Sequence, residues 1–142
     1  MAYAHCLSGH EYVYNENFDK ARLCFRITLN IDYRHYNAYW GLGNICFKQE
    51  KFDKAIEYFQ NAIQINNKCS VLYTYLGMTY TSMGKYYDAY KQFRKAEDID
   101  PTNCLNKFQK ATVLMKIGKM EVALKELTDL KQRMPKEAPI LT

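Results

Sequence analysis

Residues 36–69 read YNAYWGLGNICFKQEKFDKAIEYFQNAIQINNKC, and the pattern of this stretch returns along the chain every 34 residues. A first apolar stripe at helical spacing consists of Tyr39, Leu42, Gly43 and Cys46. A second stripe, spaced i, i+4, i+7, consists of Ala55, Phe59 and Ala62. A short polar segment at 49–51 separates the two stripes. The stretch therefore predicts two helices of roughly a dozen residues joined by a tight turn.

The same positions align in four successive copies of this pattern. One position holds glycine or alanine: Gly9, Gly43, Gly77 and Ala111. Another holds a large apolar residue: Phe25, Phe59, Phe93 and Leu127. Polar turns recur at 15–17, 49–51, 83–85 and 117–119. We therefore expect one domain over 1–142, with repeats at about 2–35, 36–69, 70–103 and 104–137 and the start of a fifth repeat after Pro135.

A single hairpin of this kind cannot bury its apolar face, so neighbouring hairpins must stack. The pattern predicts an all-α fold, a right-handed α-solenoid with a concave inner face lined by the first helix of each hairpin. A period of 34 with these glycine, alanine and phenylalanine positions, and with prolines at Pro101 and Pro135, resembles the tetratricopeptide repeat (TPR) family. The fourth copy departs most, because Lys107, Lys110 and Ala111 stand where an aromatic residue, Leu and Gly are expected.

Composition narrows the class of protein further. A hydrophobic content of 48% with 15% aromatic residues argues against disorder. No apolar run approaches the roughly 20 residues that span a bilayer, and the first residues lack a secretory signal pattern. Five cysteines, an odd number without a C-x-x-C pair, indicate reduced thiols. We expect an intracellular protein, in nucleus and cytoplasm, that does not bind membranes.

Catalysis and cofactor binding have little support in the sequence. His5, His10 and His35 are too few and too poorly spaced to form a metal site with the cysteines. No nucleophile elbow, phosphate loop or paired-carboxylate motif occurs. The net charge of +5 is spread along the chain, and many of the 13 tyrosines fall in packing positions. We expect no enzyme activity, cofactor, metal or nucleic-acid partner.

Several strings go beyond the general repeat pattern. They are GHE at 9–11, RHYNAYWGLG at 34–43, KQEKF at 48–52 and KQRMPKE at 131–137. Together they resemble the C-terminal repeats of the cell-division-cycle 27 family, the large TPR subunit of the anaphase-promoting complex. The resemblance implies a non-catalytic scaffold of a ubiquitin ligase that drives mitosis. It also implies a groove for the C-terminal Ile-Arg tails of coactivators and of a neighbouring core subunit.

Helical periodicity selects residues that face this groove. The candidates are Tyr3, His10, Tyr14, Asn37, Trp40, Asn44, Phe47, Val71 and Thr74. The amides of Asn37 and Asn44 could hold an extended peptide backbone, and Trp40 is large enough to anchor a side chain. Packing between repeats is an equally good explanation for any one of these residues. For an Ile-Arg tail, the guanidinium partners would be Glu11 or Glu16; the terminal carboxylate would meet Arg34, His35 or Lys48.

The competing hypothesis is a general TPR adaptor without a cell-cycle role, such as a cochaperone. Cochaperone repeats hold terminal carboxylates with Lys, Asn and Arg at fixed positions, and of those positions only Asn44 matches here. No polar capping helix follows Pro135, and solenoids need caps for solubility. We therefore expect the chain to be part of a longer array, and its uncapped ends to favour self-association.

Overall fold

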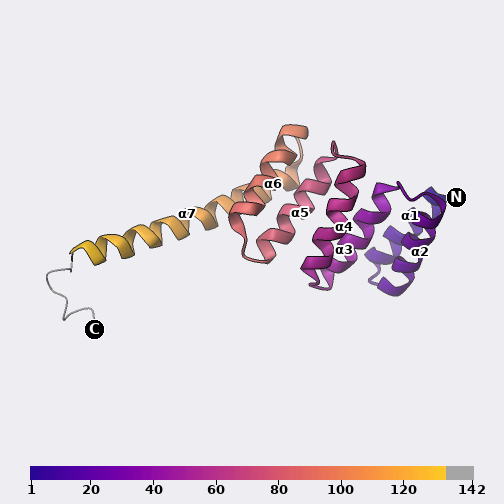
Figure 1. The fold of residues 1–142 in the computed structure, drawn as a ribbon, viewed down its shortest axis with the longest axis horizontal. Helices are drawn as coiled ribbons and strands as arrows, with labels where there is room; N and C mark the ends of the chain where they lie inside the picture. The colour runs from indigo at the N-terminus through magenta and orange to yellow at the C-terminus, as the bar shows by residue number, and fades with distance from the viewer. Residues whose placement is uncertain (134–142) are drawn as a thin grey trace.

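The computed structural model describes residues 1–133, which form seven α-helices (Figure 1). Six of them form three hairpins: α1 (Ala2–Tyr14) with α2 (Phe18–Ile31), α3 (Tyr36–Lys48) with α4 (Phe52–Ile65), and α5 (Ser70–Ser82) with α6 (Tyr86–Ile99). The last helix, α7, spans Cys104–Arg133. The expected all-α solenoid of stacked hairpins is confirmed. None of these helices is both long and apolar enough to cross a membrane.

Contacts between helices define the inner face of the solenoid. The first helices of successive hairpins touch one another, α1 against α3, α3 against α5, and α5 against α7. Within the described residues, the second helices α2, α4 and α6 make no such contacts with one another. The array therefore curves toward α1, α3 and α5, which line its concave side.

Each hairpin is closed by a phenylalanine ring pressed against a glycine. Phe25, Phe59 and Phe93 are fully buried. A Cβ atom built on Gly43 would lie only 2.6 Å from Cε1 of Phe59, and the glycines of the other two hairpins are equally close to their phenylalanines. Since carbon atoms normally approach to about 3.5–4.0 Å, only glycine lets the two helices pack at this distance.

The turns within the hairpins share one backbone geometry. The second residue after each first helix lies in the left-handed region, with φ of 61° at Glu16, 61° at Glu50 and 78° at Gly84. In the second hairpin the amide of Lys51 then donates to the carbonyl of Cys46 at 2.8 Å, which satisfies a free carbonyl at the helix end. This geometry reverses the chain within three residues.

The fourth hairpin expected at 104–137 is not formed, because α7 runs unbroken through the expected turn at 117–119. Gly118 occupies the position of Glu16, Glu50 and Gly84 but is helical and lacks their positive φ. A turn here would be stabilised mainly by packing of the second helix, and Lys107 and Lys110 weaken the apolar face that would receive it. Continuous α-helix then satisfies the backbone at lower cost. The expected fifth repeat lies outside the described residues.

Candidate peptide-binding groove

Aromatic rings from three hairpins meet along the inner helices. The ring centroids of His10 on α1 and Trp40 on α3 lie 5.0 Å apart, and Trp40 meets Tyr75 on α5 edge-on at 5.4 Å. Behind them, His10 also packs against Phe25 at 4.9 Å. All three inner rings are half-buried. They form a strip, which we call the aromatic strip (His10, Trp40, Tyr75), that crosses the three hairpins.

Trp40 combines packing with exposure. Its ring packs against the buried cluster of Ala55, Phe59 and Leu76, so it contributes to the core between the second and third hairpins. Its indole Nε1 is buried and has no hydrogen-bond partner. An unpaired buried donor costs stability. Trp40 is therefore a packing residue whose ring still keeps an accessible part on the inner face.

The other predicted residues differ widely in accessibility. Tyr3, Tyr14 and Val71 are exposed, with 88% of Tyr14 accessible to solvent. Asn37 and Phe47 are half-buried, and the Phe47 ring packs against a phenylalanine of its own hairpin. Only 9% of Asn44 is accessible, so its amide has little surface to offer a peptide. Of the two amides, Asn37 is the better placed to bind one.

The prediction for Thr74 is wrong, because this side chain is fully buried. Its hydroxyl lies 3.1 Å from both the carbonyl of Ser70 and Oδ1 of Asn106, and it accepts from Nδ2 of Asn103 at 3.3 Å. Nδ2 of Asn106, also buried, donates to the carbonyl of Phe93 at 2.9 Å. These bonds attach the start of α7 to the third hairpin. Thr74 is thus a structural residue.

The surroundings of the aromatic strip disfavour protonation of His10. Burial, reinforced by the charge of His35, lowers the pKa of His10. One turn earlier on α1, burial raises the pKa of the Cys6 thiol to about 11, and its Sγ lies 3.5 Å from Nε2 of His10. The charged candidates Glu11, Arg34 and Lys48 are exposed, while Nδ1 of His35 is buried without a partner. The strip is therefore an aromatic surface with exposed charged side chains at its edge.

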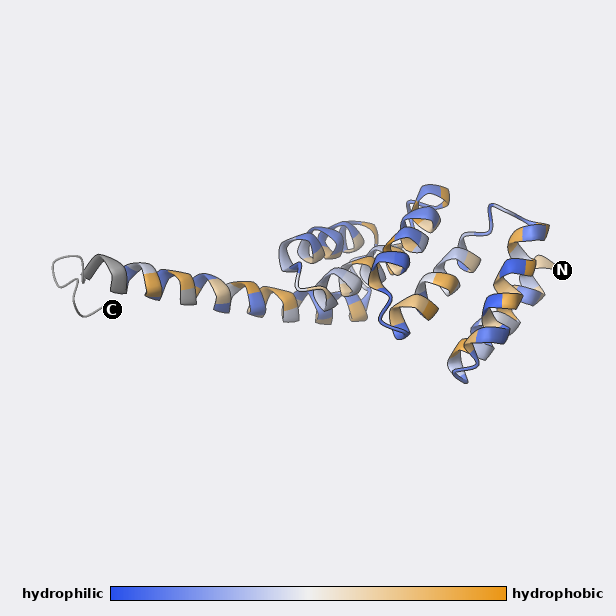
Figure 2. Ribbon diagram, turned by 60° about the horizontal axis from the view of Figure 1, so that its bottom comes forward, coloured by the Kyte–Doolittle hydropathy of each residue, from blue (hydrophilic) through white to orange (hydrophobic). Residues whose placement is uncertain are grey.

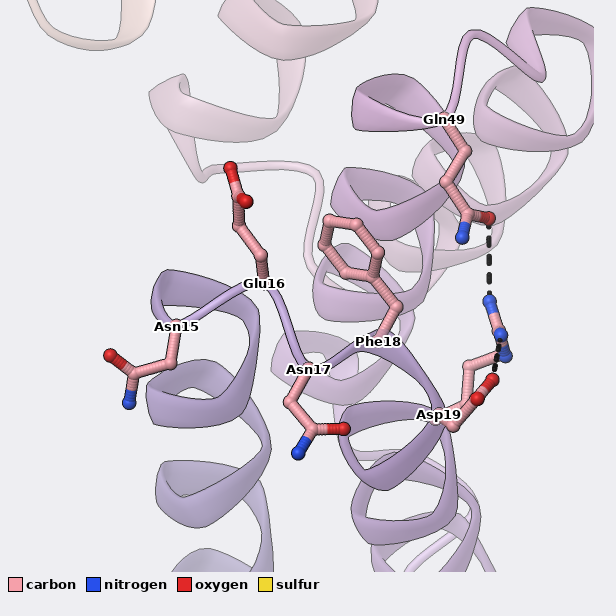
Figure 3. A pocket seen from close by; sticks show the side chains of 7 residues that line it. Asn15, Glu16, Asn17, Phe18, Asp19 and Gln49 are labelled. Carbon is pink, nitrogen blue, oxygen red and sulfur yellow. Dashed lines mark hydrogen bonds and ion pairs between the residues drawn. The ribbon is translucent and has the colours of Figure 1, made fainter.

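Apart from the aromatic strip, a polar hollow lies at the turn of the first hairpin (Figure 3). Arg22 is already engaged there, donating to Asp19 at 2.6 Å and to Gln49 at 3.3 Å. Glu16 projects into solvent from the turn itself. Because these contacts connect α2 to the end of α3, the hollow serves packing of the first two hairpins. No group of three metal-binding side chains gathers anywhere in the described part of the chain.

Sequence reasoning missed Tyr75 as a member of the strip. Its position in the preceding repeat holds Gly41, which packs under Phe25, so periodicity gave no reason to place an aromatic groove residue there. The available signal was local: Tyr75 lies on the inner helix next to Thr74, and its size lets it reach Trp40 where the shorter threonine does not.

Comparisons with known proteins agree with this architecture. Tetratricopeptide repeat models match residues 36–69 and 72–103. The first TPR domain of Spaghetti (RPAP3), solved with the HSP90 peptide SRMEEVD, superposes with a TM-score of 0.76 at 17% identity, covering 82% of this chain and 93% of that one. MamA superposes with a TM-score of 0.72 at 22% identity, covering 97% and 81%. At these identities the likeness shows the fold alone.

Two curated relatives match nearly the whole sequence. Anaphase-promoting complex subunit 3 of Schizosaccharomyces pombe is 38% identical over 138 residues, which cover 97% of this chain and 21% of that protein. Cell division cycle protein 27 homolog B of Arabidopsis thaliana is 36% identical over 140 residues, covering 99% and 19%. The chain thus spans about a fifth of the length of these relatives. It is a tetratricopeptide repeat protein whose repeats are similar to those of the cell-division-cycle 27 family.

Proposed function

We propose that this chain is a non-catalytic scaffold segment of an anaphase-promoting complex, acting in the nucleus and cytoplasm, and that its inner face receives C-terminal tails ending in Ile-Arg. The observation that carries the proposal is the aromatic strip, which crosses all three hairpins on the concave side. Similarity to two subunits of this family over nearly the whole chain supports the assignment to that assembly.

The strip and its charged edge suit such a tail chemically. An isoleucine side chain would pack on the half-buried rings of Trp40 and Tyr75. The guanidinium would pair with the exposed carboxylate of Glu11, next to His10 on α1. Arg34 or Lys48, both exposed cations near the ends of α3, would meet the terminal carboxylate, and the amide of Asn37 would hold the backbone.

Fluorescence anisotropy tests the proposal with a labelled peptide that ends in Ile-Arg and carries a free carboxylate. We expect binding at roughly micromolar strength, about −8 kcal/mol, that is lost when the same peptide is amidated. The peptide SRMEEVD serves as a chemically different terminal carboxylate. Equal binding of both peptides would favour a general adaptor over an Ile-Arg receptor. A folded chain that binds neither would refute the groove assignment.

Two variants localise the binding. His10→Ala removes one ring of the strip, and Asn37→Ala removes the accessible amide; each should weaken the tail by about tenfold or more, since anchor residues typically contribute over 1 kcal/mol. Leu23→Ala is the matched control, because Leu23 is exposed on α2, away from the inner helices. If Leu23→Ala weakens binding as much as the other two do, the peptide does not bind at the strip.

A further inference from the structure

One side of α7 carries an apolar surface that nothing in the structure covers. Large residues recur there every seven positions, at Phe108, Met115 and Val122, with 67%, 63% and 57% of each accessible. Small residues alternate with them, at Cys104, Ala111 and Gly118. With 3.6 residues per turn, all six lie on one side of the helix. We call this surface the α7 seam.

The rest of the fold lies on the other side of α7. Asn106, Val113 and Ile117 are buried against the third hairpin, half a turn away from the seam. Beyond the hairpins α7 continues alone (Figure 1), and apolar residues recur along this projecting part (Figure 2). The seam is therefore free along its whole length to meet another helix.

The seam contains a hollow that can accept one side chain of another helix. A mostly apolar hollow centred on Gly118 is lined by Met115, Gly118, Lys119 and Val122, with Glu126 at its edge. The first four positions are spaced i, i+3, i+4, i+7, the set that forms the hole for one knob in coiled-coil packing. Because Gly118 has no side chain, this hole can take a large aromatic ring.

We propose that a second copy of this chain occupies the seam, with the two α7 helices antiparallel and related by a two-fold axis. A single register sets each large residue opposite a small one of the other copy. Phe108 faces Gly118, Met115 faces Ala111, and Val122 faces Cys104. The same face thus supplies both knobs and holes, which is the property of a self-complementary two-fold interface.

Charge supports the antiparallel register. On one flank of the seam, this arrangement brings Lys107 of one helix beside Glu121 of the other. Both residues are exposed, and within the part of the chain that the structure describes the side chain of Glu121 accepts one hydrogen bond, from the hydroxyl of Tyr87 at 3.1 Å. A parallel, in-register arrangement would instead set identical seam residues side by side, large against large and small against small, and would keep Lys107 and Glu121 apart. Opposite charges favour the two-fold antiparallel pair.

The size of the seam determines how tight the pair can be. From Cys104 to Val122 it covers 19 residues, a length of roughly 28 Å along the helix. A single pair of helices of this length falls at the small end of specific interfaces. The dimer is therefore weak, and its population rises with chain concentration.

Sedimentation velocity over roughly a 100-fold concentration range measures this equilibrium. The unaltered chain should shift from monomer toward dimer. Phe108→Glu should leave it monomeric. Gly118→Leu should do the same by filling the hole, although leucine favours helix over glycine and should raise helicity. Leu124→Glu is the matched control, since Leu124 is exposed on the opposite side of α7 and should leave dimerisation unchanged.

Charge reversal tests the register itself. Lys107→Glu and Glu121→Lys should each weaken the dimer, and the double variant should restore it, because only an antiparallel pair brings these two positions together. A chain that stays monomeric over the whole concentration range would overturn the proposal. So would the finding that residues 120–133 fold back onto residues 104–117 of the same molecule. Dimers unaffected by Phe108→Glu and Gly118→Leu would place the interface elsewhere.

Discussion

Gly43→Ala and Gly118→Ala make the same chemical change in two helices, and the structure predicts opposite effects on stability. At Gly118 an added Cβ meets no atom within 4 Å. The only consequence is the higher helix propensity of alanine, worth about 1 kcal/mol. Gly118→Ala should therefore stabilise the chain by about that amount.

At Gly43 the same gain in propensity is opposed by a clash. The new Cβ would lie 2.6 Å from Cε1 and 2.8 Å from Cδ1 of Phe59, a ring that is fully buried between two hairpins. Overpacking of a filled core costs about 1–3 kcal/mol. After the propensity gain is subtracted, Gly43→Ala should destabilise by about 1 kcal/mol, so the two variants should differ by about 2 kcal/mol.

Urea unfolding followed by circular dichroism, at a concentration where the chain is monomeric, measures both values. A second change checks the cause: Phe59→Leu should relieve the clash, so Gly43→Ala should cost less in that background than in the unaltered chain. The fourth copy of the pattern already carries this combination, with Ala111 and Leu127. If Gly43→Ala stabilises as much as Gly118→Ala, the ring of Phe59 moves aside without cost. The close approach of the two helices would then not be the reason for glycine at position 43.

Three further predictions follow from the buried polar and titratable groups. Asn106→Ala should destabilise by about 2 kcal/mol, because it leaves the carbonyl of Phe93 without its buried donor; hydrogen exchange should then quicken in 104–117 and remain slow in the first hairpin. Folded His10 resists protonation, whereas the unfolded chain takes up a proton near its ordinary pKa of about 6.5. Stability should thus fall as pH drops below that value, and thermal unfolding of His10→Phe should show a smaller pH dependence. Cys6 is buried and its pKa is raised, whereas Cys104 is exposed. At mildly alkaline pH, Cys6 should therefore be alkylated far more slowly than Cys104, as measured by mass spectrometry of digests. Equal rates of alkylation would contradict the burial of Cys6.

The hairpins could be predicted from sequence because their determinants are local and repeated. Gly43 and Phe59 specify one close contact, and equivalent pairs return at the same spacing in the neighbouring repeats. The course of the fourth copy of the pattern could not be predicted in this way. Gly118 has the right position for a turn, but a turn forms only where the next helix finds a surface to pack on, and that surface depends on residues far along the chain.

The groove residues were harder to predict, because position on a helix does not determine how far a side chain reaches. Trp40 and Thr74 occupy equivalent positions in successive repeats. The indole extends to meet His10 and Tyr75, whereas the short threonine is covered by Asn106 from the following helix. Periodicity describes the backbone, and the size of each neighbour decides what remains accessible.

The contacts between helices also have a mechanical consequence. Within the described residues each hairpin touches only the elements next to it in sequence, and the first hairpin makes no contact with the third. When one hairpin rotates slightly against its neighbour, no contact between more distant hairpins resists the rotation. Small rotations at successive junctions therefore add up along the array. The array as a whole should therefore bend and twist easily, while each hairpin keeps its shape. A peptide that touches all three inner helices would link the first hairpin to the third. It would then restrict rotation between hairpins and stiffen the whole array through contacts at a few rings.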